Sequence, residues 1–297
     1  MAGSEIDSVR ALLSAKPRPV GWAQRRSRIE EVGAADPVAA DVALTPETVG
    51  GVDCEWSLAP GSDPGRLLVY FHGGGYCSGS IVSHRGLVTE AGRAARCRTL
   101  AVQYRLAPEH PFPAAQDDAA AVWAALVGPL GYAPSSVALA GDSAGGNLSV
   151  ATANALRAAG QPEPAALWLL SPWTDLTMSG ATLDSKDAVD PLIHRVYLEE
   201  LATAYCGTGA LRGDPRVSVL ASDLKGSPPM LIQVGSSETL LSDAVRLAEA
   251  AGAAEVPVTL EIYPGMIHAF PLWHRRLSAG RRAIAHAARF LQAAWAA

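Results

Sequence analysis

The stretch SVALAGDSAGGNLSVATANAL, residues 136–156, decides the fold. An apolar run typical of a buried strand passes directly into GDSAG and then into a run of small residues typical of a helix. The junction matches the pattern G-x-S-x-G, in which Gly141 and Gly145 permit a sharp strand-to-helix turn. Such a turn lifts the side chain of Ser143 clear of the backbone at the carboxyl edge of a sheet. The stretch therefore predicts an α/β fold with Ser143 as a candidate nucleophile.

A glycine-rich turn with a capping serine is the plainer interpretation of the same five residues, because G-x-S-x-G often occurs by chance. The strand before the motif and the helix after it favour the catalytic interpretation. The first amides of that helix, beginning with Ala144 N–H, have no partner within the helix and lie beside Ser143. We expect them to stabilise negative charge that develops on an oxygen atom bound there.

Short apolar runs alternate with helical stretches from Val52 onward, which predicts a mostly parallel sheet covered by helices on both faces. The expected helices lie around residues 114–127, 146–159, 243–251 and 275–296. The expected strands are VDCEWSLAP, RLLVYFHG, RTLAVQY, SVALAGDS, ALWLLSP, MLIQVG and VPVTLEIY.

One interval breaks this alternation. Roughly fifty to sixty residues separate ALWLLSP from MLIQVG, far more than an ordinary crossover of about a dozen residues needs. Near the N-terminus, Ile6, Val9, Leu12 and Leu13 share one helical face that needs something to cover. We expect a single domain spanning 1–297, with a helical cap formed by about 1–45 and about 178–215.

Composition narrows the possible partners and location. The formal net charge of −5 gives nucleic acid no electrostatic reason to bind. The four cysteines are scattered without CxxC pairing, so reduced, buried or nearly buried thiols are expected rather than a zinc or dithiol site. The first residues lack the apolar core of a signal peptide, and no uncharged apolar stretch reaches membrane-spanning length. We expect a soluble, cytoplasmic protein with no membrane partner.

A second glycine cluster follows another apolar strand in LLVYFHGGGYCSGS. Its glycines, residues 73–75, let backbone amides converge closely on one point, as an oxyanion site requires. A phosphate-binding loop is the alternative, but neither a GKS or GKT continuation nor dinucleotide-binding spacing is present. His72 is interpreted as a structural residue that holds this loop, and not as a general base.

A nucleophilic serine needs a histidine base, and in this type of fold the acid and then the histidine follow the serine along the chain. His268 lies in the loop PGMIHAF directly after the strand VPVTLEIY, where a Pro-Gly turn can direct it over the sheet edge. Of the other downstream histidines, His194 belongs to the expected cap, and His274 and His286 belong to the basic final helix and its approach. His268 is the predicted base.

Three acids are candidates for the partner of His268. Asp190 belongs to the expected cap and precedes the strand MLIQVG, so it is interpreted as a decoy. Asp243 follows Ser242, a plausible helix cap, so the helix dipole alone explains an acid there. Glu238 lies in the loop after that strand, where its carboxylate can reach an imidazole. Glu238 is the predicted acid, and Asp243 is the second choice.

Together these features resemble the bacterial hormone-sensitive-lipase family of carboxylesterases, from about Leu67 to His268. The matching elements are HGGGY, YRLAPEHPFPAAQDD, GDSAGG, DPRVSVLASDLKGSPPMLIQVGSSETLLSDA and YPGMIHAF. The resemblance implies an α/β-hydrolase fold with an eight-stranded sheet and a helical cap. It also implies oxyanion amides from Gly74, Gly75 and Ala144, a small-molecule ester as substrate, and a possible homodimer paired through the last strand.

One departure concerns the acid. Family members with GDSAGG usually carry Asp-Pro-Leu at this point, whereas this chain has Glu238-Thr239-Leu240. A glutamate can do the same work, because the acid only orients the imidazole and stabilises its cation. The expected activity is hydrolysis of small, short-acyl esters through an acyl-enzyme, with no cofactor and no metal. A lactone hydrolase, an amidase or peptidase, and a non-catalytic ligand-binding member of the fold remain alternatives.

Several other residues receive structural interpretations. Arg105 and Glu109 are expected to brace a loop beneath the site through buried ion pairing, and Asp142 is expected to be a hydrogen-bonding brace. The apolar residues Trp173, Met178 and Leu183 fit either an acyl pocket or ordinary packing of the cap.

Overall fold

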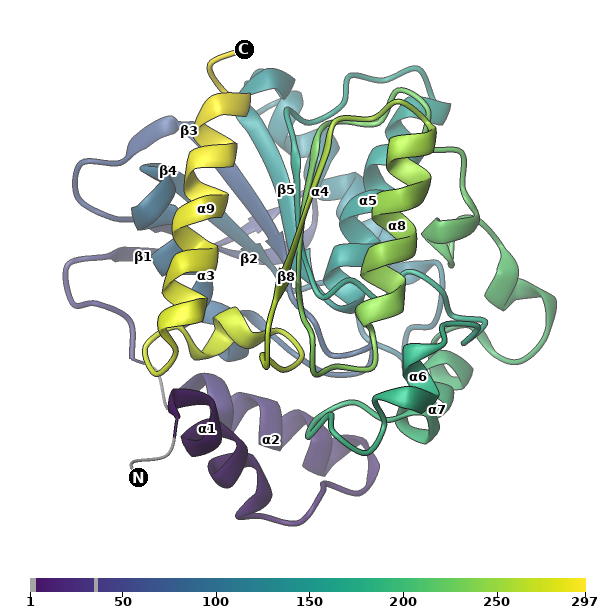
Figure 1. The fold of residues 1–297 in the computed structure, drawn as a ribbon. Helices are drawn as coiled ribbons and strands as arrows, with labels where there is room; N and C mark the ends of the chain where they lie inside the picture. The colour runs from purple at the N-terminus through teal and green to yellow at the C-terminus, as the bar shows by residue number, and fades with distance from the viewer. Residues whose placement is uncertain (1–3, 35–36) are drawn as a thin grey trace.

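An eight-stranded sheet forms the centre of the computed structural model, which describes residues 4–34 and 37–297 (Figure 1). The spatial order is β1-β2-β4-β3-β5-β6-β7-β8. The strands from β4 to β8 run parallel, and only the pairs β1–β2 and β2–β4 are antiparallel, so the expected mostly parallel sheet is confirmed. The strands are β1 (Ala43–Val49), β2 (Val52–Leu58), β3 (Asp63–Phe71), β4 (Cys97–Val102), β5 (Val137–Asp142), β6 (Leu167–Leu170), β7 (Met230–Gly235) and β8 (Val258–Tyr263).

Two layers of helices cover the sheet, and alternation along the central strands explains why. In β3, Leu67 and Val69 contribute to one buried cluster, whereas Leu68 and Tyr70 contribute to the other. The first cluster includes α4, α5 and α8, and the second includes α3 and α9, on opposite faces (Figure 1). The helices are α1 (Glu5–Ser14), α2 (Gly21–Ala34), α3 (Ile81–Ala95), α4 (Ala114–Val127), α5 (Ala144–Ala158), α6 (Thr182–Ser185), α7 (Arg195–Cys206), α8 (Leu241–Ala253) and α9 (Ser278–Ala294).

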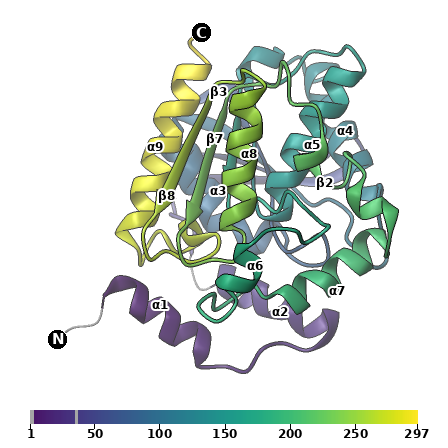
Figure 2. The same cartoon turned by 45° about the vertical axis from the view of Figure 1, so that its right-hand side comes forward.

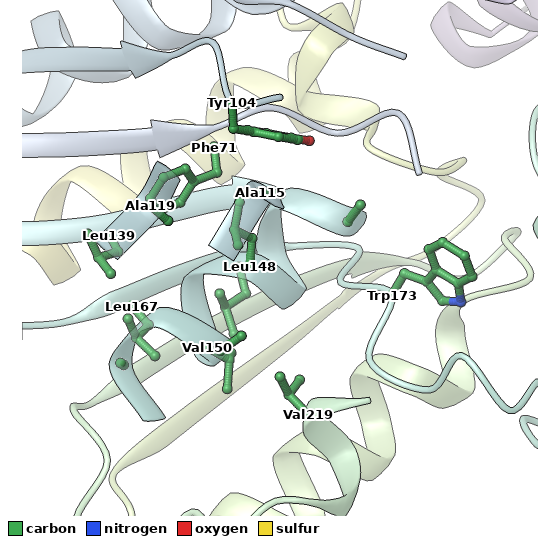
Figure 3. Close-up of a cluster of buried hydrophobic side chains, with 14 of the residues drawn as sticks. Phe71, Tyr104, Ala115, Ala119, Leu139, Leu148, Val150, Leu167, Trp173 and Val219 are labelled. Carbon is green, nitrogen blue, oxygen red and sulfur yellow. The ribbon is translucent and has the colours of Figure 1, made fainter. Parts of the chain in front are cut away.

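The larger apolar cluster lies between the sheet and helices α4 and α5 (Figure 3). Phe71 from β3 and Leu139 from β5 pack there with Leu148 from α5, and each is almost completely buried. Burial of side chains of this size stabilises the fold by about 1.5–3 kcal/mol each. The packed layer beneath the carboxyl ends of β3 and β5 makes a rigid base for the loops that follow those strands.

Helices α1, α2, α6 and α7 lie together beyond the carboxyl ends of the parallel strands (Figure 2). Helix α1 docks through Val9, which is fully buried against Ile267 and Phe270 in the loop after β8. Leu12, expected on the same buried face, is instead 46% exposed. Two segments distant in sequence, one N-terminal and one between β6 and β7, therefore meet at the edge of the sheet that carries the glycine motifs.

Several boundaries differ from the sequence expectation. Strand β1 was not expected, and it begins at Ala43, so residues 43–45 belong to the sheet rather than to the first cap segment. Helix α3 was also not expected. Ser242 is not the cap of α8, because the helix begins at Leu241 and its N-cap is Leu240. Among the described residues, no helix is both long enough and apolar enough to cross a bilayer.

Candidate active site

Ser143 occupies the turn between β5 and α5. Its backbone has φ 53° and ψ −120°, a conformation that a non-glycine residue rarely adopts without support from its surroundings. The flanking glycines allow this turn, because a Cβ atom at Gly145 would lie 1.9 Å from Phe71 O and one at Gly141 would lie 2.4 Å from Gly145 C. The turn is held by hydrogen bonds from Ser143 N–H to Leu170 O (2.9 Å) and from Trp173 N–H to Ser143 O (3.0 Å).

The predicted base and acid follow neighbouring strands at the same edge. Glu238 follows β7 and His268 follows β8, and β5, β6, β7 and β8 are consecutive in the sheet. His268 Nδ1 lies 3.1 Å from Glu238 Oε1, and both side chains are buried. Because a carboxylate oxygen only accepts, Nδ1 carries the proton and donates it, which leaves Nε2 of the neutral ring as the basic nitrogen.

The charge environment favours a basic His268. Burial by itself lowers the pKa of His268, but the hydrogen bond and charge of Glu238 and the charges of Asp190 and Asp142 raise it. The net result is a pKa above the ordinary histidine value.

The other two candidate acids are engaged elsewhere. Asp243 Oδ2 accepts from the amides of Thr174 (2.9 Å) and Asp175 (3.0 Å), and its other oxygen faces Arg246. Burial raises the pKa of Asp243 to about 7, although Arg246 opposes the shift. Such a carboxyl is partly protonated at neutral pH and is a weaker partner for an imidazolium.

Asp190 lies nearer to the acid loop than its place in the sequence suggests. Its Oδ2 accepts from Thr239 N–H at 2.8 Å, and its Oδ1 accepts from the amides of Leu192 (2.9 Å) and Ile193 (3.0 Å). The carboxylate is buried and joins the segment before α7 to the residue after Glu238. Its contacts are therefore those of a brace between two loops.

The glycine loop after β3 lies beside the Ser143 turn. Gly74 has φ 115° and Gly75 has φ 63°, and a Cβ atom would lie 2.2 Å from Ser78 O at the first position and 2.4 Å from Leu201 Cδ1 at the second. A Cβ atom would therefore clash with backbone at Gly74 and would displace the side chain of Leu201 at Gly75, and both positions have a positive φ that favours glycine. Within residues 4–34 and 37–297, the amides of Gly74, Gly75 and Ala144 have no hydrogen-bond acceptor.

A buried network ties the glycine loop to the turn. Asp142 Oδ1 accepts from Gly73 N–H and Tyr70 O–H, each at 2.9 Å, and His84 Nε2 lies 3.2 Å from the same oxygen. Asp142 is thus confirmed as a hydrogen-bonding brace. Burial, followed by the charge of His84, lowers the pKa of His72 to about 3, so His72 is neutral and lies with its Nδ1 2.9 Å from Gly73 O.

The loop after β4 is braced, but not as expected. Arg105 pairs with Asp118, and Glu109 pairs with Arg26 of α2, and the side chains of Arg105 and Glu109 are about half exposed. The expectation of buried ion pairing was therefore wrong. Arg26 also donates from Nε to Cys77 O (2.9 Å) and from Nη2 to Ala107 O (3.0 Å), so it links α2 directly to the glycine loop.

Apolar and aromatic side chains close the space around these groups. Tyr76 follows the glycines and stacks on Tyr205 of α7, with 3.8 Å between ring centroids. The three apolar residues for which a pocket or a packing role was left open are all almost fully buried: Trp173, Met178 and Leu183.

The cysteines and acids offer little to a metal. The four thiols are free and buried, as expected, and burial raises the pKa of Cys54, Cys77 and Cys97 to about 12 and that of Cys206 to about 11. Across residues 4–34 and 37–297, no group of three His, Cys, Asp or Glu side chains is arranged to hold a metal ion.

Comparison with known proteins agrees with this architecture. The family description "alpha/beta hydrolase fold" matches residues 68–272. The chain belongs to the α/β-hydrolase fold family. An acetyl-hydrolase from Streptomyces hygroscopicus is 41% identical and covers 99% of this chain and 98% of its own. A solved esterase of the bacterial hormone-sensitive lipase family is 39% identical, covers 99% of this chain and 100% of its own, and has a TM-score of 0.95.

A second solved relative, the esterase EstE5 soaked with p-nitrophenyl butyrate, is 38% identical over the full length of both chains, with a TM-score of 0.94. These similarities confirm the resemblance to the bacterial hormone-sensitive-lipase family that the motifs HGGGY and GDSAGG carry. This member of the α/β-hydrolase family is an enzyme that hydrolyses carboxylic esters.

The structure also adds residues that the sequence did not single out. Arg26 and Ser171 contact the glycine loop and the acid, respectively. The place of Ser171 has a readable signal, because it follows β6 directly, as Ser143 follows β5. Arg26 carries no comparable signal, since its partners lie more than fifty residues away along the chain.

Proposed function

We propose that this α/β-hydrolase cleaves small, short-acyl carboxylic esters with Ser143 as nucleophile, His268 as general base and acid, and Glu238 as the acid that orients the histidine. The observation that carries the proposal is the hydrogen bond from His268 Nδ1 to the fully buried Glu238, which leaves Nε2 basic. The alternative acids, Asp190 and Asp243, have other partners.

In the proposed first step, His268 Nε2 takes the hydroxyl proton of Ser143 as Oγ attacks the ester carbonyl carbon. The carbonyl oxygen becomes an oxyanion, and the amides of Gly74, Gly75 and Ala144 donate to it. Collapse of the tetrahedral intermediate breaks the bond to the alcohol, which leaves with the proton from His268. Water then attacks the acyl carbon and gives a proton to His268. Collapse of this second tetrahedral intermediate breaks the bond to Ser143 Oγ, which takes that proton from His268, and the carboxylic acid leaves. These groups and water suffice for the reaction.

The preference for short acyl chains rests on how the site is enclosed. We propose that α1, α2, α6 and α7 form a cap over it, as the sequence led us to expect, within one domain. Leu201 of α7 packs on Gly75, and Met178 and Leu183 from the segment before α7 are buried. We infer from these buried apolar side chains that the proposed cap favours a confined site over a broad apolar surface. Similarity to an acetyl-hydrolase is consistent with small acyl groups.

Turnover of p-nitrophenyl esters from two to twelve acyl carbons tests this proposal. The expected kcat/KM is greatest for acyl chains of two to six carbons, and Ser143→Ala abolishes it for all of them. Faster hydrolysis of the long esters would overturn the acyl preference. Esterase activity retained by Ser143→Ala would overturn the proposed nucleophile.

We further propose a cytoplasmic homodimer paired through the edge strand β8, where Ile262 is 44% exposed. A lysine on an edge strand disfavours pairing with another sheet. Ile262→Lys is therefore expected to give monomers in light scattering after size-exclusion chromatography. A wild-type chain that is monomeric at assay concentration would contradict the dimer.

A further inference from the structure

Four consecutive parallel strands deliver one polar residue each to the same edge of the sheet. Ser143 follows β5, Ser171 follows β6, Glu238 lies three residues beyond β7, and His268 lies five residues beyond β8. The proposed mechanism uses the first, third and fourth of these residues. Ser171 lies between them in the sheet and has no role in that mechanism.

The side chain of Ser171 contacts Glu238 and the residue that follows His268. Its Oγ–H donates to Glu238 Oε2 at 2.8 Å. The same oxygen accepts from the amide of Ala269, the residue after His268, at 3.0 Å. One hydroxyl group therefore bridges the carboxylate of the acid and the backbone beside the base.

The backbone of Ser171 is itself firmly placed. Its amide donates to Gln233 O of β7 at 2.8 Å, and its side chain is fully buried. Its φ of 44° lies in the left-handed region, which a serine occupies at some energetic cost. This conformation aims the hydroxyl at the loops after β7 and β8.

Glu238 gains a defined orientation from this arrangement. Oε2 accepts from Ser171 Oγ and from Gly235 N–H, both at 2.8 Å, which leaves Oε1 to face His268 Nδ1. A glutamate side chain has three rotatable bonds, so a free one would sample many orientations. Two donors on one oxygen confine the carboxylate to the orientation in which the other oxygen meets the imidazole.

We propose that Ser171 is a positioning residue for this reaction, a fourth side chain that holds Glu238 and the His268 loop in register. The inference rests on the proposed function of Ser143, His268 and Glu238. It also gives a reason for a glutamate at this position. An aspartate is shorter by one carbon–carbon bond of about 1.5 Å, so the positions of the two donors and His268 in this chain suit the longer side chain of glutamate.

The test compares Ser171→Ala with wild type and with a matched control. Ser57→Ala also removes a buried hydroxyl with a hydrogen-bond partner, Thr99, but it lies in β2 on the other side of β4, away from this edge. Loss of a hydrogen bond to a charged group is expected to lower the kcat of Ser171→Ala for p-nitrophenyl butyrate about ten- to hundred-fold, with KM changed less than about three-fold. Ser57→Ala should keep the wild-type kcat.

Two further readouts separate positioning from a general structural role. The low-field proton NMR signal of His268 Nδ1–H should move upfield or broaden in Ser171→Ala and stay unchanged in Ser57→Ala. In a Glu238→Gln background, Ser171→Ala should cost little additional rate, because the amide that Ser171 then holds no longer supplies the negative charge that His268 needs. Full additivity of the two losses would overturn the inference.

The outcomes also separate this inference from the proposed function. Activity retained by Ser143→Ala would refute the proposed function. An inactive Ser143→Ala together with a Ser171→Ala enzyme that keeps wild-type kcat and NMR signal would refute the role of Ser171 alone. If Ser171→Ala does not fold, Ser171→Cys carries the same test, because a thiol is close in size but is a weak donor.

Discussion

Replacing Glu238 by glutamine probes the proposed triad at its acid. The glutamine amide keeps the shape of the side chain, and the two donors that face Oε2, Ser171 Oγ–H and Gly235 N–H, require its oxygen there. The NH₂ group then faces His268 Nδ1. An amide N–H can pair only with an unprotonated Nδ1, so the neutral imidazole carries its proton on Nε2. That tautomer cannot accept the proton of Ser143.

The expected loss of kcat in Glu238→Gln follows from the distance between His268 Nδ1 and Glu238 Oε1. A carboxylate 3.1 Å from the imidazole nitrogen stabilises its cation by about 5 kcal/mol at an effective dielectric constant of about 20. At 1.36 kcal/mol for each factor of ten, the expected loss of kcat is about three to four orders of magnitude. The same replacement of acid by amide in a serine protease triad costs about 10⁴ in kcat.

The pH dependence of kcat/KM gives a second measure of the effect of Glu238 on His268. Glu238 raises the pKa of His268, and activity requires the neutral base, so the acidic limb of kcat/KM reports this pKa. Without the carboxylate the pKa falls, and the acidic limb of the residual activity moves to lower pH. Initial rates with p-nitrophenyl butyrate from pH 4 to 9 provide both quantities.

Asp243→Asn is the matched control, because it neutralises the neighbouring buried acid in the same way. We expect it to lower kcat less than about five-fold, since Asp243 binds the amides of Thr174 and Asp175 instead of His268. A loss below ten-fold in Glu238→Gln, or a greater loss in Asp243→Asn than in Glu238→Gln, would refute the assignment of the acid.

Three further substitutions test the supports of the site. Gly75→Ala places a Cβ atom 2.4 Å from Leu201 Cδ1, so kcat should fall more than ten-fold and the melting temperature should fall. Gly61→Ala is the control, because Gly61 has a similar positive φ but faces open space, and it should keep the wild-type kcat. Equal effects of the two substitutions would contradict the close approach at Gly75. Arg26→Ala removes the donors to Cys77 O and Ala107 O and should lower kcat about three- to ten-fold in steady-state assays. Lys16→Ala breaks only an exposed ion pair with Glu31 and should leave kcat unchanged. Identical kinetics for both variants would exclude the link from α2 to the glycine loop. Asp190→Ala leaves the amide of Thr239 without its acceptor, so the free energy of unfolding measured in urea should fall by about 2–4 kcal/mol. If the folded variant had a kcat as low as that of Glu238→Gln, Asp190 would be a direct partner of His268 and not a brace.

The edge of the sheet that carries the site could be predicted because strand patterns are local. Each of β5, β7 and β8 is a short apolar run followed by a turn, and a parallel sheet brings the carboxyl ends of such runs together whatever their separation in sequence. The G-x-S-x-G pattern and the loops after β7 and β8 led to Ser143, Glu238 and His268 as candidates, and the expected proximity of Glu238 and His268 is observed.

Contacts that depend on tertiary arrangement were beyond reach. Glu109 pairs with Arg26 across 83 residues, and nothing local marks that pair. Strand β1, ALTPETV, is exposed along most of its length and contains Pro46, so it lacks the apolar run that identified the other strands. Asp190 was assigned to the cap by its position in the chain, yet its carboxylate turns toward the residue after Glu238.

Covalent labelling tests the central claim most directly. A fluorophosphonate reacts with a serine only where a base activates its hydroxyl and donors stabilise the oxyanion. The expected result is one adduct per chain by intact mass, located by peptide mapping at Ser143, with activity lost in proportion. No adduct on the active wild-type enzyme, or equal labelling of Ser143→Ala, would contradict the account.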